Sequence, residues 1–259
     1  MSTALNTLKS AGLSLLMGGL LLVGVSEARS MQDHDHGAQS HGEQTPAKKK
    51  EFSGDPYLLG VDPVSGDTLG PIDKQVIVQH EGRELRFAGE TTAATFRAEP
   101  TKYLPTIDEK MIAQQLPFYP LDTCIVSGEK LGGEMGEAID VIYKNRLVRL
   151  CCKACNKTLA KDPAAQIGKV DKAVAERQGK KYPLTTCVVS GEELGGMGDP
   201  IDYVVGNRLL RLCCKGCKKK VSSDPLAYLA KLDAAVGGEG WHGKVGHDGE
   251  HGEHSRHDG

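Results

Sequence analysis

The sequence has few aromatic residues and no strong net charge. Only 5% of its 259 residues are Phe, Trp or Tyr, and the formal net charge is −2 at pH 7. A balanced charge gives no general attraction to nucleic acid or to an anionic membrane surface. Few aromatics together with 32 glycines favour several small modules over one large core. Small modules commonly depend on bound metal or on disulfides for their stability.

Recognisable catalytic motifs are also missing. No phosphate-binding loop, dinucleotide-binding motif, carboxylate pair or Ser–His–Asp arrangement stands in a supporting context. The serines of three Val-Ser-Gly turns, Ser65, Ser127 and Ser190, have no base placed to activate them. Lysine runs at 48–50 and 218–220 are expected to be solvated surface. We therefore expect a protein that is not an enzyme and has no nucleic-acid partner.

Long apolar segments are limited to one, near the N-terminus. The run over residues 11–25 follows Lys9, and Ser-Glu-Ala at 26–28 supplies the small residues of a cleavage site. The run is shorter than the roughly 20 apolar residues of a membrane span, so it predicts a secretory signal peptide over residues 1–28. An uncleaved anchor is the alternative. We expect the mature protein to be exported, periplasmic or extracellular, with no stable membrane insertion.

The eight cysteines fall into two equal sets. The blocks Asn145-Arg-Leu-Val-Arg-Leu-Cys-Cys-Lys-Ala-Cys155 and Asn207-Arg-Leu-Leu-Arg-Leu-Cys-Cys-Lys-Gly-Cys217 are identical at nine of eleven positions, and one further cysteine precedes each block. The first set is Cys124, Cys151, Cys152 and Cys155, and the second is Cys187, Cys213, Cys214 and Cys217. Thiols placed so regularly bind metal, form disulfides or carry out redox chemistry.

The cysteine blocks belong to an internal repeat of 62 or 63 residues. Residues 119–133 match residues 182–196 at twelve of fifteen positions, and a cysteine-free copy lies upstream. In that copy the four cysteine positions are occupied by Asp62, Ala88, Gly89 and Thr92. We expect an α+β protein of three tandem modules: a degenerate module 1 (53–115), module 2 (116–180) and module 3 (181–238).

Each module is predicted to be a β-hairpin followed by two short helices. Val-Ser-Gly and Leu-Gly-Gly predict a turn after the first cysteine. Residues 139–143 and 147–151 are β-rich and are joined by Lys-Asn-Arg, which is typical of a hairpin. The helical pattern after Cys155 ends at Asp162, which caps a second helix running towards Val174. The expected core residues are Val141, Leu147 and Leu150 in module 2 and Val204, Leu209, Leu212, Leu229 and Leu232 in module 3.

The cysteine spacing leaves the ligand set open. Cys152-x-x-Cys155 has the spacing of a metal knuckle, whereas Cys151 and Cys155 would share one helical face. Adjacent cysteines point in different directions from an ideal strand, which disfavours both facing one ion. Either Cys151 or Cys152 could be the ligand, and both remain candidates. Three or four thiolates suit Zn²⁺ or Cu⁺. Basic neighbours expected to offset the thiolate charge are Arg149, Lys153, Arg211 and Lys215.

The order of cysteine, hairpin, Cys-x-x-x-Cys, helix, Asp-Pro and helix resembles the YHS and TRASH-like heavy-metal-binding modules, which are small treble-clef-like zinc-ribbon relatives. The matching residues are Cys124, Cys151, Cys155 and Asp162-Pro163, then Cys187, Cys213, Cys217 and Asp224-Pro225. The resemblance covers roughly 120 residues of the repeat and implies metal sensing, trafficking or resistance. This chain departs from it by adding Cys152 and Cys214 and by placing 25 or 26 residues between the first cysteine and the pair.

Two other functions fit the same cysteines. An exported protein meets oxidising conditions, so four cysteines per module could form two disulfides and staple an interaction protein of unknown partner. A thiol–disulfide oxidoreductase is the weaker alternative, because no βαβ pattern surrounds the Cys-x-x-Cys.

Eight of the nine histidines lie in the two terminal segments. We expect these segments, 29–52 and 239–259, to be disordered. Their histidines could bind Cu²⁺, Ni²⁺ or Zn²⁺ weakly, or could simply be solvated. The candidates are His34, His36, His242, His247, His251, His254 and His257, with His41 beside them. His80, in module 1, is expected to be surface or structural.

Overall fold

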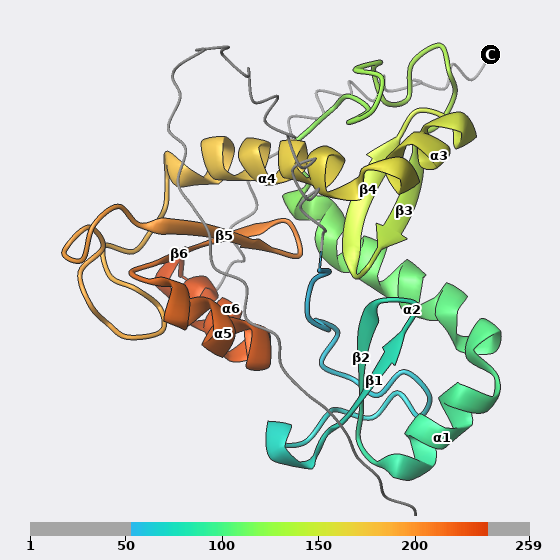
Figure 1. Cartoon of the computed structure of the whole chain (residues 1–259), viewed down its shortest axis with the longest axis horizontal. Coiled ribbons are helices and arrows are strands. Elements are labelled where there is room, and N and C mark those ends of the chain that lie inside the picture. The colour runs from blue at the N-terminus through green and yellow to red at the C-terminus, as the bar shows by residue number, and fades with distance from the viewer. Residues whose placement is uncertain (1–52, 238–259) are drawn as a thin grey trace, which may run out of the picture. The chain divides into compact units, whose positions relative to one another are not determined.

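The computed structural model describes residues 53–237 (Figure 1). The predicted signal peptide (1–28), linker (29–52) and tail (239–259), with all the terminal histidines, lie outside the described residues. The described part contains three two-stranded antiparallel sheets and six α-helices. The mixed α/β class is thereby confirmed.

Every module contains a hairpin and then two helices (Figure 1). Module 1 consists of β1 (Val76–His80), β2 (Arg83–Phe87), α1 (Glu90–Ala98) and α2 (Pro100–Gln115). Module 2 consists of β3 (Ile139–Tyr143), β4 (Arg146–Leu150), α3 (Lys153–Lys161) and α4 (Pro163–Gly179). Module 3 consists of β5 (Ile201–Val205), β6 (Arg208–Leu212), α5 (Lys215–Ser223) and α6 (Pro225–Ala235). Short 3₁₀ turns occupy Ile72–Lys74 and Leu116–Phe118.

Two left-handed residues form the turn of each hairpin. In module 2 these are Lys144 and Asn145, with φ of 46° and 68°. Positive φ at both central positions makes a turn whose twist matches that of the flanking strands. Because this turn takes only two residues, β4 begins at Arg146, one residue before the predicted start.

Aspartate caps begin the second helices of modules 2 and 3. The Asp162 side chain accepts a hydrogen bond from the Ala165 amide, and Asp224 accepts one from Ala227. A proline follows each aspartate at the first helical position, where its missing N–H costs nothing. The predicted Asp-Pro helix start is confirmed.

The hairpins of modules 2 and 3 also pack against the last helix of the preceding module. Helix α2 contacts β3 and β4, and α4 contacts β5 and β6. Val204 and Leu209 are buried as expected, but they join the core of module 2, with Val170 and Val174 of α4. Assigning them to the core of module 3 is therefore wrong. Alternate residues of a strand face opposite sides, and α4 covers the side on which these two lie.

Leu147 and Leu150 lie in the core of module 2. Leu212, Leu229 and Leu232 lie in the core of module 3. These five predicted core positions are confirmed as buried parts of their own modules.

Buried glutamines fix each of these helix–hairpin contacts. The Gln115 amide donates to the Asn145 carbonyl at 2.8 Å and accepts from the Leu147 amide at 2.8 Å. Gln178 repeats both bonds with the Asn207 carbonyl and the Leu209 amide, at 2.9 and 2.7 Å. The repeat therefore extends to the way in which neighbouring modules join.

A buried ion pair adds a third connection. Arg146 donates from Nε and Nη2 to the two carboxylate oxygens of Asp55, at 2.6 and 2.9 Å. Asp55 also accepts from the Gly206 amide at 2.7 Å, and Arg146 donates to the Val204 carbonyl at 2.8 Å. Arg146 additionally pairs with Asp171. A buried charge pair is tolerated when such further bonds satisfy both groups.

Across residues 53–237, no helix combines the length and the apolar character that crossing a bilayer demands.

Candidate metal centre

The first cysteine of each set lies in a tight turn. The Cys124 amide donates to the Glu129 carbonyl at 2.8 Å, and the Gly128 amide donates back to the Cys124 carbonyl at 2.8 Å. Gly128 has φ of 80°, which only glycine adopts without strain. Cys187 makes the corresponding bonds with Glu192 and Gly191. The turn predicted after each first cysteine is thus present, and each turn contributes one thiol, that of Cys124 or Cys187.

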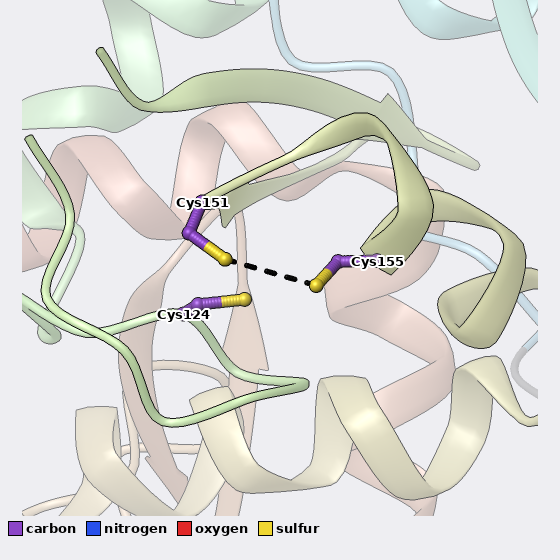
Figure 2. Close-up of side chains that lie close together, drawn as sticks. All are labelled: Cys124, Cys151 and Cys155. Carbon is purple, nitrogen blue, oxygen red and sulfur yellow. Dashed lines mark hydrogen bonds between the residues drawn. The ribbon is translucent and has the colours of Figure 1, made fainter. Parts of the chain in front are cut away.

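The other two thiols of each group come from the end of the hairpin and the start of the following helix. Cys151 directly follows β4, and Cys155 lies in the first turn of α3. Their sulfurs are 3.8 Å apart, and those of Cys213 and Cys217 are 3.7 Å apart. Figure 2 shows the side chain of Cys124 extending towards the other two from the facing loop.

Each group of three sulfurs has dimensions that suit a metal ion. In both Cys124–Cys151–Cys155 and Cys187–Cys213–Cys217 all Sγ atoms lie within 4.8 Å of one another. Thiolates bound to one ion at about 2.3 Å stand about 3.8 Å apart in tetrahedral geometry and about 4.0 Å apart in trigonal geometry. Two groups of cysteines could thus each hold a metal ion. All eight cysteines are free thiols.

The second cysteine of each adjacent pair lies at the margin of its group. Cys152 and Cys214 are only half-buried, whereas the triad thiols are between 1% and 7% exposed. The Cys152 sulfur is 3.6 Å from that of Cys155, and the Cys214 sulfur is 3.7 Å from that of Cys217. The structure thus brings Cys151 and Cys213 together with the upstream cysteines and leaves Cys152 and Cys214 partly in solvent.

Hydrogen bonds favour the thiolate form of the first cysteine in each group, Cys124 or Cys187. Burial opposes ionisation of Cys124, but hydrogen bonds from Ser127 and from nearby backbone amides outweigh it and lower the pKa to about 6. The same balance lowers the pKa of Cys187 to about 6. Burial raises the pKa of Cys155 and of Cys217 to about 12. Each group therefore places a thiol of lowered pKa beside a thiol of raised pKa.

The Val-Ser-Gly serines have a role that the sequence reading missed. The Ser127 hydroxyl lies 3.3 Å from the sulfur of Cys151, and Ser190 lies 3.3 Å from that of Cys213. The Val-Ser-Gly motif recurs in all three modules, including the one without cysteine, so the sequence alone indicates only a turn there.

Two of the basic residues expected to offset the thiolate charge pair with carboxylates of the opposite strand. Arg149 pairs with Asp140 at 2.7 Å across the hairpin, and Arg211 pairs with Asp202 at 3.0 Å. In both modules a lysine of the second helix contacts the backbone of the residue that directly follows the first cysteine. Lys169 donates to the Ile125 carbonyl at 2.8 Å, and Lys231 donates to the Val188 carbonyl at 3.3 Å. Both lysines stand seven positions after the capping aspartate, where module 1 has Thr106.

Module 1 holds a carboxylate where the other modules hold the first thiol. Asp62 accepts hydrogen bonds from the amides of Val64, Ser65 and Ala88 at 2.8, 3.1 and 2.7 Å. The Thr92 hydroxyl donates to the same carboxylate at 2.6 Å. Burial raises the pKa of Asp62, but these bonds outweigh burial and lower it below its usual range. The cysteine-equivalent positions Asp62, Ala88 and Thr92 are thus brought together as the alignment predicts.

His80 lies apart from both cysteine groups. Its ring packs edge-on against Phe96, with centroids 5.5 Å apart, in keeping with the structural role expected of it. Comparisons with protein-family models, with curated proteins and with solved structures found no match to this chain.

Proposed function

We propose that this protein is an exported metal-binding protein that holds one soft or borderline ion in each of modules 2 and 3. The observation that carries the proposal is the convergence of three buried thiols from three elements, which occurs twice with the same geometry. Neither group serves an evident packing purpose that requires sulfur. Module 1 packs a similar hairpin and helix pair without any cysteine.

Metal explains the grouping better than disulfides do. A disulfide joins two sulfurs, whereas here Cys155 lies within reach of three neighbouring thiols. Two disulfides per module would use all four cysteines, yet all eight are free thiols. An ion bound by all three satisfies every sulfur at once, and the low pKa of Cys124 supplies a ready anionic ligand.

The sulfur-only donor set favours Cu⁺ or Zn²⁺ over Mg²⁺ or Ca²⁺, which prefer oxygen. Three buried thiolates suit trigonal Cu⁺, and a fourth thiolate from Cys152 or Cys214 would complete a tetrahedral Zn²⁺ site. No metal step or catalysis is assigned to the sites, since binding itself is the proposed activity.

The resemblance to YHS and TRASH-like modules supports a role in heavy-metal capture or trafficking. We propose that the three modules are tandem copies of such a unit, and that the N-terminal segment exports them to the periplasm or the extracellular space. The terminal histidines would then act as a weak outer capture segment.

The test is metal analysis of the mature protein, purified without chelator, combined with thiol counting. We expect about two Zn or Cu ions per chain, because a formed thiolate site retains its ion at neutral pH. Cys151→Ser with Cys213→Ser should abolish binding, and His80→Gln should leave it unchanged. Absence of both metal and free thiols would instead support the disulfide-stapled protein. Rapid turnover in an insulin-reduction assay would support the oxidoreductase.

A further inference from the structure

Cys152 and Cys214 are the thiols that link each buried triad to solvent. We propose that they are exchange thiols, which take a soft metal ion from an external thiol carrier and pass it to the triad. Release follows the same route in reverse. The proposal rests on the proposed function and adds to it a path for the ion.

The distances allow an ion to move without any rearrangement of the backbone. The sulfurs of Cys152 and Cys155 are 3.6 Å apart, and those of Cys214 and Cys217 are 3.7 Å apart. Two thiolates that share one ion stand about 3.8 to 4.0 Å apart. Each half-buried thiol can therefore share an ion with one triad thiol. The other two triad sulfurs lie within 4.8 Å of that triad sulfur.

The triad cysteines are more deeply buried than Cys152 and Cys214, which indicates where an ion enters each group. The triad cysteines are only 1% to 7% exposed, so a carrier molecule has little access to them. Cys152 and Cys214 are half-buried, and they directly precede α3 and α5. They are consequently the sulfurs of each group that an external thiolate complex can best approach.

The fold does not itself require a thiol at these positions. Cys152 and Cys214 occupy the N-cap positions of their helices, yet neither side chain makes a capping hydrogen bond. Gly89 occupies the same position in module 1, in extended backbone with φ of −173° that any residue adopts. Helix α1 thus begins without a thiol at this position, so the fold does not require one there.

The step is a ligand substitution without oxidation or reduction. A bond forms between the ion and the exposed sulfur as the bond between the ion and the carrier thiolate breaks. The proton of the exposed thiol goes to solvent, and the departing carrier takes up a proton. The triad sulfurs then displace the exposed sulfur one after another. Each protonated triad thiol releases its proton to solvent as it binds, the displaced sulfur takes up a proton, and the oxidation state of the ion is unchanged.

The experiment uses the mature chain and Cu⁺ supplied as its glutathione complex. Uptake is followed by quenching with bathocuproine disulfonate, and release by direct transfer to that chelator in a stopped-flow instrument. The test variant is Cys152→Gly/Cys214→Gly, which reproduces Gly89 of module 1 and cannot ligate. The matched variant is Cys151→Gly/Cys213→Gly, and circular dichroism checks that each is folded.

We expect the Cys152→Gly/Cys214→Gly variant to retain two Cu⁺ per chain while uptake and release slow at least tenfold. The Cys151→Gly/Cys213→Gly variant should lose stoichiometric binding. Maleimide should label Cys152 and Cys214 before any other cysteine of the loaded protein.

Unchanged rates in the Cys152→Gly/Cys214→Gly variant would overturn the exchange role. Loss of both ions in that variant would also overturn it, because the two thiols would then be permanent ligands. If the unaltered protein binds no Cu⁺ and no Zn²⁺, the proposed function itself fails, and that outcome is separate from the other two.

Discussion

Modules 1 and 2 place different chemistry on the same backbone. In module 1 the Asp62 carboxylate accepts from the amides of Val64 and Ser65. In module 2 the corresponding amides, those of Val126 and Ser127, lower the pKa of Cys124. The turn is therefore an anion-binding loop, and it accepts either a carboxylate or a thiolate.

The partner of that anion differs in the same way. Thr92 donates a hydroxyl to Asp62 at 2.6 Å, at the position where module 2 has Cys155. A hydrogen bond thus joins the loop to the helix in module 1, whereas a shared metal ion would join them in module 2. The comparison teaches that the loop–helix connection is the constant feature and that metal is one of two ways to make it.

The hydrophobic cores of the modules also differ in the size of their side chains. Module 1 buries Phe87 and Phe96, whose ring centroids are 5.3 Å apart. The aligned residues are Leu150 and Leu159 in module 2 and Leu212 and Val221 in module 3, all fully buried. Aromatic side chains bury more apolar area than Leu or Val. Module 1 therefore stabilises itself by packing, and the other two have more to gain from an ion.

Metal removal should produce the largest effect. Structural zinc sites contribute about 10 kcal/mol or more to the folding free energy of small domains. A chelator should therefore unfold β4 and β6 and leave the amides of β1 and β2 protected from hydrogen exchange. Hydrogen–deuterium exchange of the strand amides measures this directly. Equal loss of protection in all three hairpins would contradict the claim that module 1 is stable without metal and the other two modules are not.

Building the missing site should add one ion. Asp62→Cys/Ala88→Cys/Thr92→Cys places three thiols where module 2 has its triad, so bound metal should rise from about two ions per chain to about three. Metal analysis gives the answer, with Asp62→Cys alone as the control that should add none. A count unchanged in the triple variant would show that the anion-binding loop is not sufficient for a site.

Asp62→Asn should destabilise module 1 moderately. The neutral amide keeps the shape but loses charge-assisted hydrogen bonds, which should cost about 1.5 to 3 kcal/mol. The lowered pKa of Asp62 gives stability that is present above the unfolded value of about 3.9. That stability is lost as pH falls through the lower folded value. Urea unfolding at several pH values should show this loss in the unaltered protein and not in the variant.

Lys169→Met should have the smallest effect. It removes a cation beside the Cys124 loop and should weaken metal binding by module 2 about tenfold, as is typical of residues that support a ligand. Competition with a chromophoric chelator measures the change. Lys172→Met on the same helix is the matched control, since its side chain faces solvent and Glu176. Equal weakening by both variants would point to a general charge effect.

The sequence was most informative where neighbouring residues determine the structure. The hairpins, the Asp162 cap and the alignment of Asp62 with the cysteines follow from local pattern and repeat. The shared faces of the hairpins could not be predicted, because burial of Leu209 by α4 depends on how modules pack. The choice of Cys151 over Cys152 depends on the twist at the end of β4, which spacing does not specify.

The buried pair of Asp55 and Arg146 also bears on the order in which the chain folds. Asp55 is separated by 91 residues from Arg146 and by 151 from Gly206, to which it is also bonded. Contacts between such distant residues form late, because closing long loops costs entropy before any bond is gained. We therefore expect the segment around Asp55 to reach its final place after the hairpins of modules 2 and 3 have formed. The first described residues of the chain are then among the last to be fixed.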